Sequence, residues 1–220
     1  SNVVCRALPE PGKEIAKKRS AYRLSSSRMD VLLNKDFPSI QSYTWKDNQA
    51  RLNGQLFDVK GITINGDYYQ PKVTSKVEAD CILYTLKVKE IGVTLHVCCE
   101  VTDNIFQLSV KKIEEDGDVK VKTLAFPDHH LVSASASTPN ASLAIADNVH
   151  SDIFYPLKDK AVDNTCQYGS ILLLNSDKLV ATLESNSIYG TRQFLYQSVQ
   201  LPGEVVTGIW GNEWIYRGHD

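Results

Sequence analysis

Two adjacent histidines, His129 and His130, are the sharpest polar feature of this 220-residue chain. An imidazole exchanges a proton near neutral pH, so either residue could act as a general acid or base toward a sugar. That chemistry also needs a carboxylate within hydrogen-bond reach of the same substrate. No glutamate pairs obviously with either histidine in the sequence. The pattern therefore favours a role in a loop or at a strand entry, and we predict no catalytic residue in this chain.

Aromatic side chains supply a second candidate site. Three tryptophans and a tyrosine could form a sugar platform, because aromatic rings stack on the apolar face of a pyranose. These residues are Trp45, Trp210, Trp214 and Tyr216. Exposed aromatic patches also mark contacts between proteins or domains. Both interpretations fit the residue types, so position in the chain has to decide between them.

Metal and disulfide chemistry are weakly supported. His96 lies in an apolar run and is expected to be a core or face residue, while His150 and His219 have no ligand-spaced partners, so we predict no metal and no cofactor. The five cysteines (Cys5, Cys81, Cys98, Cys99 and Cys166) match no zinc spacing. Neighbouring Cys98 and Cys99 should point to opposite faces of a strand. We favour buried, unbonded cysteines, with a bridge from Cys81 to Cys98 or Cys99 left open.

Composition limits the classes of function. The formal net charge is −2, which excludes a general nucleic-acid surface, and no stretch is apolar enough to span a bilayer. The N-terminus lacks the apolar core of a signal peptide. Residues 1–24 differ in composition from the rest and are expected to be a leader or linker, with a short helix over residues 13–23. Residues 25–220 are expected to form one large domain.

The remaining sequence reads almost continuously as β-strands. Strands are predicted by period-2 alternation and by tight turns such as Asn65-Gly66. The predicted strands in the first part of the domain are 29–33, 40–45, 72–77, 81–88, 93–101, 105–114 and 119–126. The acidic turn at 115–118 is expected to pair the last two as a ribbon.

The last third continues the same pattern with shorter strands. Predicted strands cover 131–136, 142–146 and 153–156, followed by a hairpin over 169–183 and an apolar, aromatic end over 205–216. Residues 185–201 fit no single period, and a short helix is allowed there. Without alternation of strands and helices, a doubly wound parallel sheet is excluded. The pattern predicts an all-β protein built as a large antiparallel β-sandwich.

Several motifs, taken in order, resemble a known family. They are Phe37-Pro38-Ser39-Ile40-Gln41-Ser42-Tyr43, Ile64-Asn65-Gly66-Asp67-Tyr68-Tyr69-Gln70-Pro71, Phe126-Pro127-Asp128-His129-His130-Leu131-Val132-Ser133, the hairpin that runs into Glu184-Ser185-Asn186-Ser187, and Gly211-Asn212-Glu213-Trp214-Ile215-Tyr216-Arg217-Gly218. Together they resemble the galactose-mutarotase-like supersandwich domain that precedes the catalytic barrel in endo-α-N-acetylgalactosaminidases. The resemblance covers most of residues 28–217.

The resemblance implies a non-catalytic β-supersandwich domain of a glycosidase that acts on mucin-type O-glycans. Its implied partner is a catalytic barrel in the same polypeptide, and its implied location is secreted or cell-surface. Because the family's barrel follows this domain, Trp210, Trp214 and Tyr216 are then better explained as an interface than as a sugar platform. The alternatives are a carbohydrate-binding module for galactose or N-acetylgalactosamine, or an enzyme resembling an aldose epimerase.

Overall fold

The structure is a computed structural model of residues 1–220. It describes residues 19–55, 57–126 and 132–133 with their side chains, and from residue 134 onward the backbone of the strands named below. Within this described part the fold is all-β and antiparallel, with one short 3₁₀ turn, η1 (Lys89–Ile91), and no α-helix. The predicted fold class, a large antiparallel β-supersandwich, is confirmed.

The largest sheet contains eight strands in the order β1-β2-β3-β4-β12-β20-β19-β15. Its strands are β1 (Ala21–Ser25), β2 (Met29–Asn34), β3 (Ile40–Trp45), β4 (Arg51–Asn53), β12 (Ser133–Ser135), β15 (Tyr168–Gly169), β19 (Phe194–Leu201) and β20 (Glu204–Ile209). β1 begins within the predicted leader. The prediction of a helix over residues 13–23 is therefore wrong for residues 21–23, which form part of this strand. Ala21–Ser25 instead pairs residue by residue with β2, which gives its backbone groups partners in the ladder.

A second sheet is a four-stranded meander, β10-β9-β8-β7, made of β7 (Lys72–Glu78), β8 (Cys81–Val88), β9 (Val93–Thr102) and β10 (Ile105–Glu115). The predicted strands match these bounds closely, and burial alternates along β7 and most clearly along β8. In β8 the even-numbered residues Ile82, Tyr84, Leu86 and Val88 are buried, and the odd-numbered residues are at least partly exposed. The period-2 pattern thus determines which face of this sheet meets the core.

Two smaller sheets complete the described part. One has the order β18-β21-β11-β5-β6, with β5 (Ile62–Ile64), β6 (Asp67–Tyr69), β11 (Thr123–Phe126), β18 (Thr191–Arg192) and β21 (Asn212–Ile215). The other has the order β14-β13-β16-β17, with β13 (Ser142–Ala146), β14 (Ile153–Pro156), β16 (Ile171–Asn175) and β17 (Val180–Leu183). The predicted hairpin over 169–183 is confirmed as the β16–β17 pair.

Two predictions about local pairing are wrong. β10 and β11 do not form a ribbon, because β11 pairs with β5 and β21. The acidic turn instead folds back on itself: the Glu115 carboxylate accepts a hydrogen bond from Val121 N at 2.7 Å. The short helix allowed within 185–201 is also wrong for 194–201, which form β19 and pair with β20. These residues instead extend the eight-stranded sheet, with Tyr196 opposite Ile209 and Leu201 opposite Glu204.

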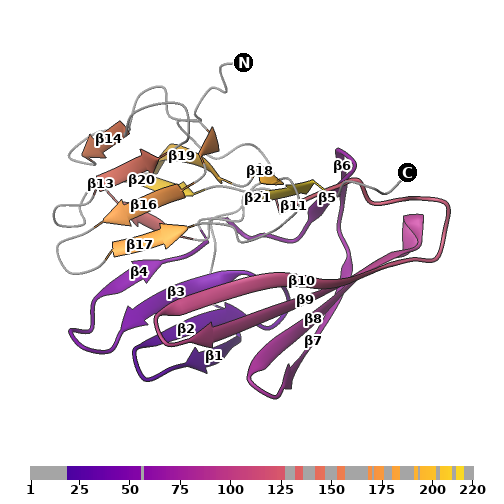
Figure 1. Cartoon of the computed structure of the whole chain (residues 1–220), viewed down its shortest axis with the longest axis horizontal. Coiled ribbons are helices and arrows are strands. Elements are labelled where there is room, and N and C mark those ends of the chain that lie inside the picture. Colours follow the sequence, from indigo (N-terminus) through magenta and orange to yellow (C-terminus); the bar gives the residue numbers. More distant parts are fainter. Residues whose placement is uncertain are drawn as a thin grey trace.

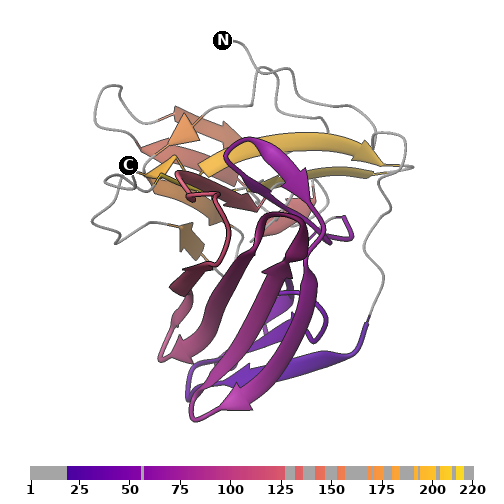
Figure 2. The same ribbon diagram turned by 90° about the vertical axis from the view of Figure 1, so that its right-hand side faces the viewer.

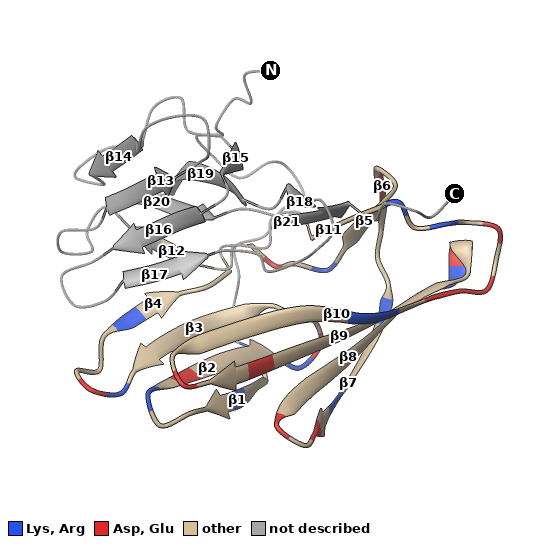
Figure 3. Ribbon diagram, viewed as in Figure 1, with Lys and Arg blue, Asp and Glu red and all other residues tan. Residues whose placement is uncertain are grey.

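The main described core lies between β1–β3 and the β7–β10 sheet, which face each other in Figures 1 and 2. Its fully buried side chains include Leu33, Ile40, Tyr84, Leu86 and Leu95. Burying one such large apolar side chain stabilises the fold by about 1.5–3 kcal/mol. Charged residues gather instead at turns and strand ends, notably the β7–β8 turn and the segment after β10 (Figure 3).

Candidate functional site

The structure describes two of the six predicted site residues, Trp45 in full and Trp214 by its backbone. The other four lie outside the described residues: His129, His130, Trp210 and Tyr216. Trp214 lies in β21, where its backbone pairs with Leu124 of β11 and Thr191 of β18. Trp45 is the last residue of β3 and is described in full. Among the predicted site residues, Trp45 is the one whose side-chain surroundings the structure describes.

Trp45 is half-buried and is already engaged on its exposed side. Its register partner is Met29, a buried residue, and the indole packs against the core. The Arg28 guanidinium lies over the ring, 4.7 Å from its centroid. A cation at this distance is attracted to the electron-rich ring face. The ring face that Arg28 covers is therefore closed to a stacked sugar unless Arg28 moves.

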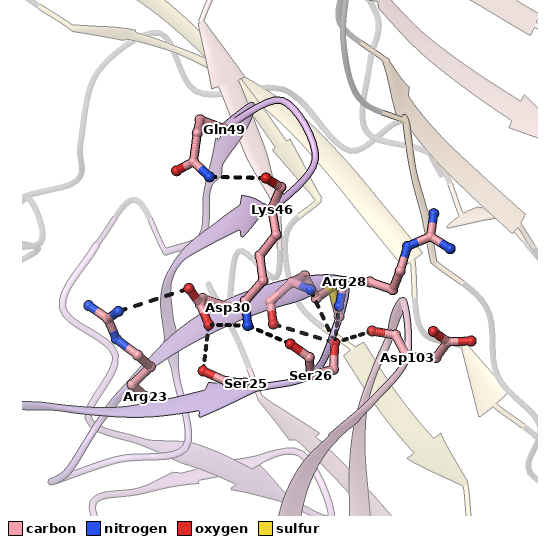
Figure 4. Close-up of polar contacts among 9 residues, drawn as sticks. Arg23, Ser25, Ser26, Arg28, Asp30, Lys46, Gln49 and Asp103 are labelled. Carbon is pink, nitrogen blue, oxygen red and sulfur yellow. Dashed lines mark hydrogen bonds and ion pairs between the residues drawn. The ribbon is translucent and has the colours of Figure 1, made fainter.

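Beside Trp45 lies a polar group that we call the Asp30 cluster, drawn in Figure 4. It consists of Arg23, Ser25, Ser26, Arg28, Asp30, Lys46 and Asp103. The Asp30 carboxylate is 3.9 Å from Arg23 Nη1 and 3.7 Å from Lys46 Nζ, and it accepts a hydrogen bond from Ser25 Oγ. The two cations and the hydroxyl share one carboxylate.

Ser26 organises the turn that carries this cluster. Its hydroxyl oxygen accepts hydrogen bonds from Arg28 N and Met29 N, each at 3.1 Å, as serine hydroxyls commonly do in turns. The same hydroxyl donates to the Asp103 carbonyl in the β9–β10 turn. Lys46 Nζ donates to the Ser26 carbonyl at 2.6 Å. Ser26 thus ties the β1–β2 turn to β9–β10 and to the end of β3.

The chemistry available to the Asp30 cluster is recognition rather than proton transfer. The Asp30 carboxylate is already engaged by two cations and by the Ser25 hydroxyl, so its oxygens are committed to contacts within the cluster. Arg28 faces both Trp45 and the Asp47 carboxylate, which is 3.7 Å from Arg28 Nη2. The cluster presents cations and carboxylates side by side on one end of the sheet. Such a surface can hydrogen-bond a polar ligand or another protein surface.

A histidine–glutamate pair appears where the sequence did not reveal one. His96 Nε2 lies 3.3 Å from Glu114 Oε2, and Lys112 Nζ lies 3.0 Å from Glu114 Oε1. The pair forms because Lys112 is the register partner of His96, with a bulge at this point of β10. The sequence did hold a signal for this contact, because His96 and Glu114 lie in two strands predicted to be neighbours. Only the register could bring them together.

This pair is poorly suited to acid–base catalysis. The pKa of Glu114 is lowered, first by its hydrogen bond to Lys112 and then by its hydrogen bond to His96. A catalytic acid or base works best with a pKa near the operating pH. The two side chains also bond to each other instead of facing each other across a space for a sugar. The geometry therefore describes a solvent-facing ion pair.

A shallow hollow of about 630 Å³ lies near the β5–β6 turn. It is lined by Asn65, Asp118, Val119, Lys120, Lys122 and Thr123. Asn65 adopts the left-handed conformation (φ 53°) that the Asn-Gly turn requires, and Gly66 follows with φ 87°. The side-chain oxygen of Asn65 accepts hydrogen bonds from Lys122 N at 2.7 Å and Thr123 N at 3.1 Å, and its Nδ2 donates to the Lys120 carbonyl at 2.8 Å. The Asn65 side chain is therefore committed to holding the neighbouring loop and is not directed at a ligand.

In the described part of the chain, no three His, Cys, Asp or Glu side chains converge as a metal site would require. Among the same residues, no helix is both long and apolar enough to cross a bilayer.

Residues 24–220 match the family described as the galactose mutarotase-like fold domain. The chain belongs to this family. The match spans the full set of strands from β2 to β21, which explains why a long antiparallel series dominates the sequence. The predicted resemblance to a galactose-mutarotase-like supersandwich is confirmed.

One curated protein and one solved structure are similar to this galactose mutarotase-like domain. A curated protein of Renibacterium salmoninarum, provisionally named an endo-alpha-N-acetylgalactosaminidase, is 26% identical in an alignment 217 residues long. The alignment covers 88% of this chain and 14% of that protein. The chain thus spans about one seventh of the length of this relative. A solved galactose mutarotase related enzyme from Lactobacillus acidophilus is 12% identical, covers 91% of this chain and 98% of its own, and superposes with a TM-score of 0.44.

Proposed function

We propose that this galactose mutarotase-like domain is a non-catalytic part of a glycosidase that acts on mucin-type O-glycans, and that it supports a catalytic barrel in the same polypeptide. One observation carries the proposal. The chain aligns over 88% of its length with only 14% of a relative whose provisional name is an endo-alpha-N-acetylgalactosaminidase. A domain that occupies so small a share of a glycosidase leaves the larger share for its catalytic machinery.

The described side chains support a non-catalytic role. Retaining and inverting glycosidases place two carboxyl groups on opposite sides of the scissile bond. The two carboxylates described above, Asp30 and Glu114, are instead paired with lysine, arginine or histidine. The pKa of Glu114 is lowered by its partners, so this carboxyl group is poorly suited to donate a proton to a leaving group near neutral pH.

The first experiment assays the isolated chain with an aryl glycoside of the core mucin disaccharide. The expected result is no turnover above a buffer blank, in preparations checked for contaminating glycosidase. The parent protein assayed beside it should hydrolyse the same substrate. Turnover by the isolated chain would overturn the non-catalytic assignment. A parent inactive on this substrate, while active on another glycoside, would overturn the mucin specificity alone.

A glycan array with the isolated chain tests the alternative role of a carbohydrate-binding module for galactose or N-acetylgalactosamine. The supporting role predicts no selective binding. Selective binding of these sugars would replace the supporting role with recognition, and the Arg28–Trp45 stack would be the first place to look for the contact. An Arg28→Ala variant, which uncovers the ring, is the matched probe for that contact.

The proposal places the aromatic end of the chain, Trp210, Trp214 and Tyr216, against the barrel. Aromatic side chains bury large areas and dominate the energy of interfaces. Trp214→Ala should then change the melting temperature of the isolated chain little while weakening the parent enzyme. A large loss of stability in the isolated chain would instead make Trp214 a core residue of this domain. The proposal also includes secretion or display at the cell surface, which fractionation of the source cells tests.

A further inference from the structure

Two of the cysteines are brought together on one face of the β8–β9 pair. The register pairs Cys81 with Glu100 and Leu83 with Cys98. Residues opposite each other in an antiparallel pair share a face, as do residues two apart on one strand. Cys81 and Cys98 therefore occupy the two ends of one diagonal on the outer face. Cys99 pairs with Ile82 and lies on the inner face.

The structure distinguishes this pair from Cys99. All three described cysteines, Cys81, Cys98 and Cys99, are free thiols. Cys81 and Cys98 share the outer face of the β8–β9 pair, whereas Cys99 lies on the inner face. Cys99 is fully buried in the core, and burial raises the pKa of its thiol, so it is an inert hydrophobe.

We infer that Cys81 and Cys98 are a modification site, where exchange with a small-molecule disulfide forms an intramolecular disulfide across β8 and β9. Cys81 is half-buried and Cys98 is only 6% exposed, so exchange begins at Cys81. The Cys81 thiolate attacks the small disulfide and releases one small thiol. The Cys98 thiolate then attacks the Cys81 sulfur and releases the second. Two cysteine thiols are oxidised, one disulfide is reduced to two thiols, and both cysteine protons pass to solvent or to the released thiolates.

The local backbone permits this bond. Diagonal neighbours in an antiparallel pair are further apart than direct partners, and a disulfide needs a short Cα separation. Cys81 is the first residue of β8, directly after the β7–β8 turn, and Ala79 in that turn has a positive φ of 50°. A strand end beside a turn can shift with less disruption than the middle of a ladder. The right-handed twist of the pair also shortens one of its two diagonals.

The surroundings of Cys81 favour a cationic co-reactant. Glu78 of β7 and Glu100 of β9 are its register partners on either side. Lys76 Nζ lies 3.7 Å from Glu78 and offsets part of that charge. Two carboxylates against one ammonium leave a local negative field, which attracts cystamine and repels glutathione disulfide at low ionic strength.

The decisive experiment maps disulfides in the full-length parent protein after incubation with cystamine, under non-reducing digestion and mass spectrometry. The expected result is one linked pair of peptides containing Cys81 and Cys98. Cys81→Ala and Cys98→Ala should each abolish that species, whereas the matched Cys99→Ala should retain it. Amide hydrogens of residues 82–97 should exchange about tenfold faster in the reduced protein, because the bridge restrains opening of the ribbon.

The contrary outcomes are equally specific. Cys81 or Cys98 recovered as a free thiol in the folded, cystamine-treated protein would overturn the inference, as would a bond from either residue to Cys5, Cys99 or Cys166. A mixed disulfide that persists at Cys81 would show that Cys98 cannot reach it. Equal oxidation rates with cystamine and glutathione disulfide at low salt would refute the charge preference. None of these results depends on whether the parent protein is a glycosidase.

Discussion

Two polar groups at opposite ends of β2 use similar chemistry in different surroundings. The Asp30 cluster lies near the β1–β2 turn, where Arg23 and Lys46 approach the Asp30 carboxylate at 3.9 and 3.7 Å. At the other end of β2, Asn34 is fully buried and makes close hydrogen bonds. Its Nδ2 donates to Ser39 Oγ at 2.7 Å, and its Oδ1 accepts from Gln41 Nε2 at 2.7 Å.

The buried group connects the two sheets that enclose the core. Tyr84 in β8 is fully buried, and its hydroxyl donates to the Asn34 carbonyl at 2.5 Å. Nearby, Tyr22 and Ser75 share a hydrogen bond of 2.8 Å, and Ser75 Oγ donates to the Lys35 carbonyl at 2.6 Å. Water can replace a lost partner at the Asp30 cluster but not at Asn34. We therefore expect the buried hydrogen bonds of Asn34 to stabilise the fold strongly. The Asp30 cluster should contribute little to stability, so its polar groups are available for recognition.

The largest effect is expected for Asn34→Ala. It removes two buried side-chain hydrogen bonds and leaves Ser39 and Gln41 without their partner, so the free energy of unfolding should fall by about 2–4 kcal/mol. Urea unfolding of the isolated chain measures the change. The matched substitution at the exposed group is Asp30→Ala. Equal losses for the two variants would contradict the comparison.

Tyr84→Phe should cost about 1–2 kcal/mol, because it deletes one hydroxyl and leaves the buried Asn34 carbonyl with one bond fewer. The apolar ring is kept, so the packing of the core is preserved. Tyr22→Phe is the control: its hydroxyl also crosses between the sheets but lies in a half-buried place, and its loss should be smaller. A larger loss for Tyr22→Phe than for Tyr84→Phe would show that burial does not rank these bonds.

Asp30→Asn should lower the free energy of unfolding by only about 0.5 kcal/mol, and the loss should shrink further in 1 M salt. Its ion pairs are long and partly solvated. Arg28→Ala should have a similarly small effect through the lost contact with Trp45. A loss above 2 kcal/mol for Asp30→Asn would mean that the cluster is structural, and its assignment to recognition would fail.

The smallest effect concerns Glu114. Its folded pKa is lowered by the hydrogen bonds to Lys112 and His96. The stabilisation from ionised Glu114 is therefore present above the ordinary carboxyl pKa and is lost as pH falls through the lowered folded value. Because Glu114 is exposed, the change should be slight and should vanish in Glu114→Gln. Carboxyl titration by NMR checks the direction, and a raised pKa would be the contrary result.

The sequence by itself determined the class of the fold and most of its strands. Alternation in Ile40–Trp45 and Cys81–Val88 predicts β3 and β8 with the observed bounds, because a half-buried strand needs a period of two. The Asn65-Gly66 turn could also be predicted from local sequence, since both residues tolerate the positive φ values found there. The family could likewise be predicted from the sequence alone, through the order of its motifs.

Only the tertiary structure decided which strands and side chains meet. It moved β11 from the expected ribbon with β10 to a sheet with β5 and β21, paired His96 with Glu114, and set Cys98 rather than Cys99 on the face of Cys81. The sequence predicted that Cys98 and Cys99 point apart but not which one shares a face with Cys81. Strand partners and register depend on long-range packing, and a shift of one residue would exchange the two faces.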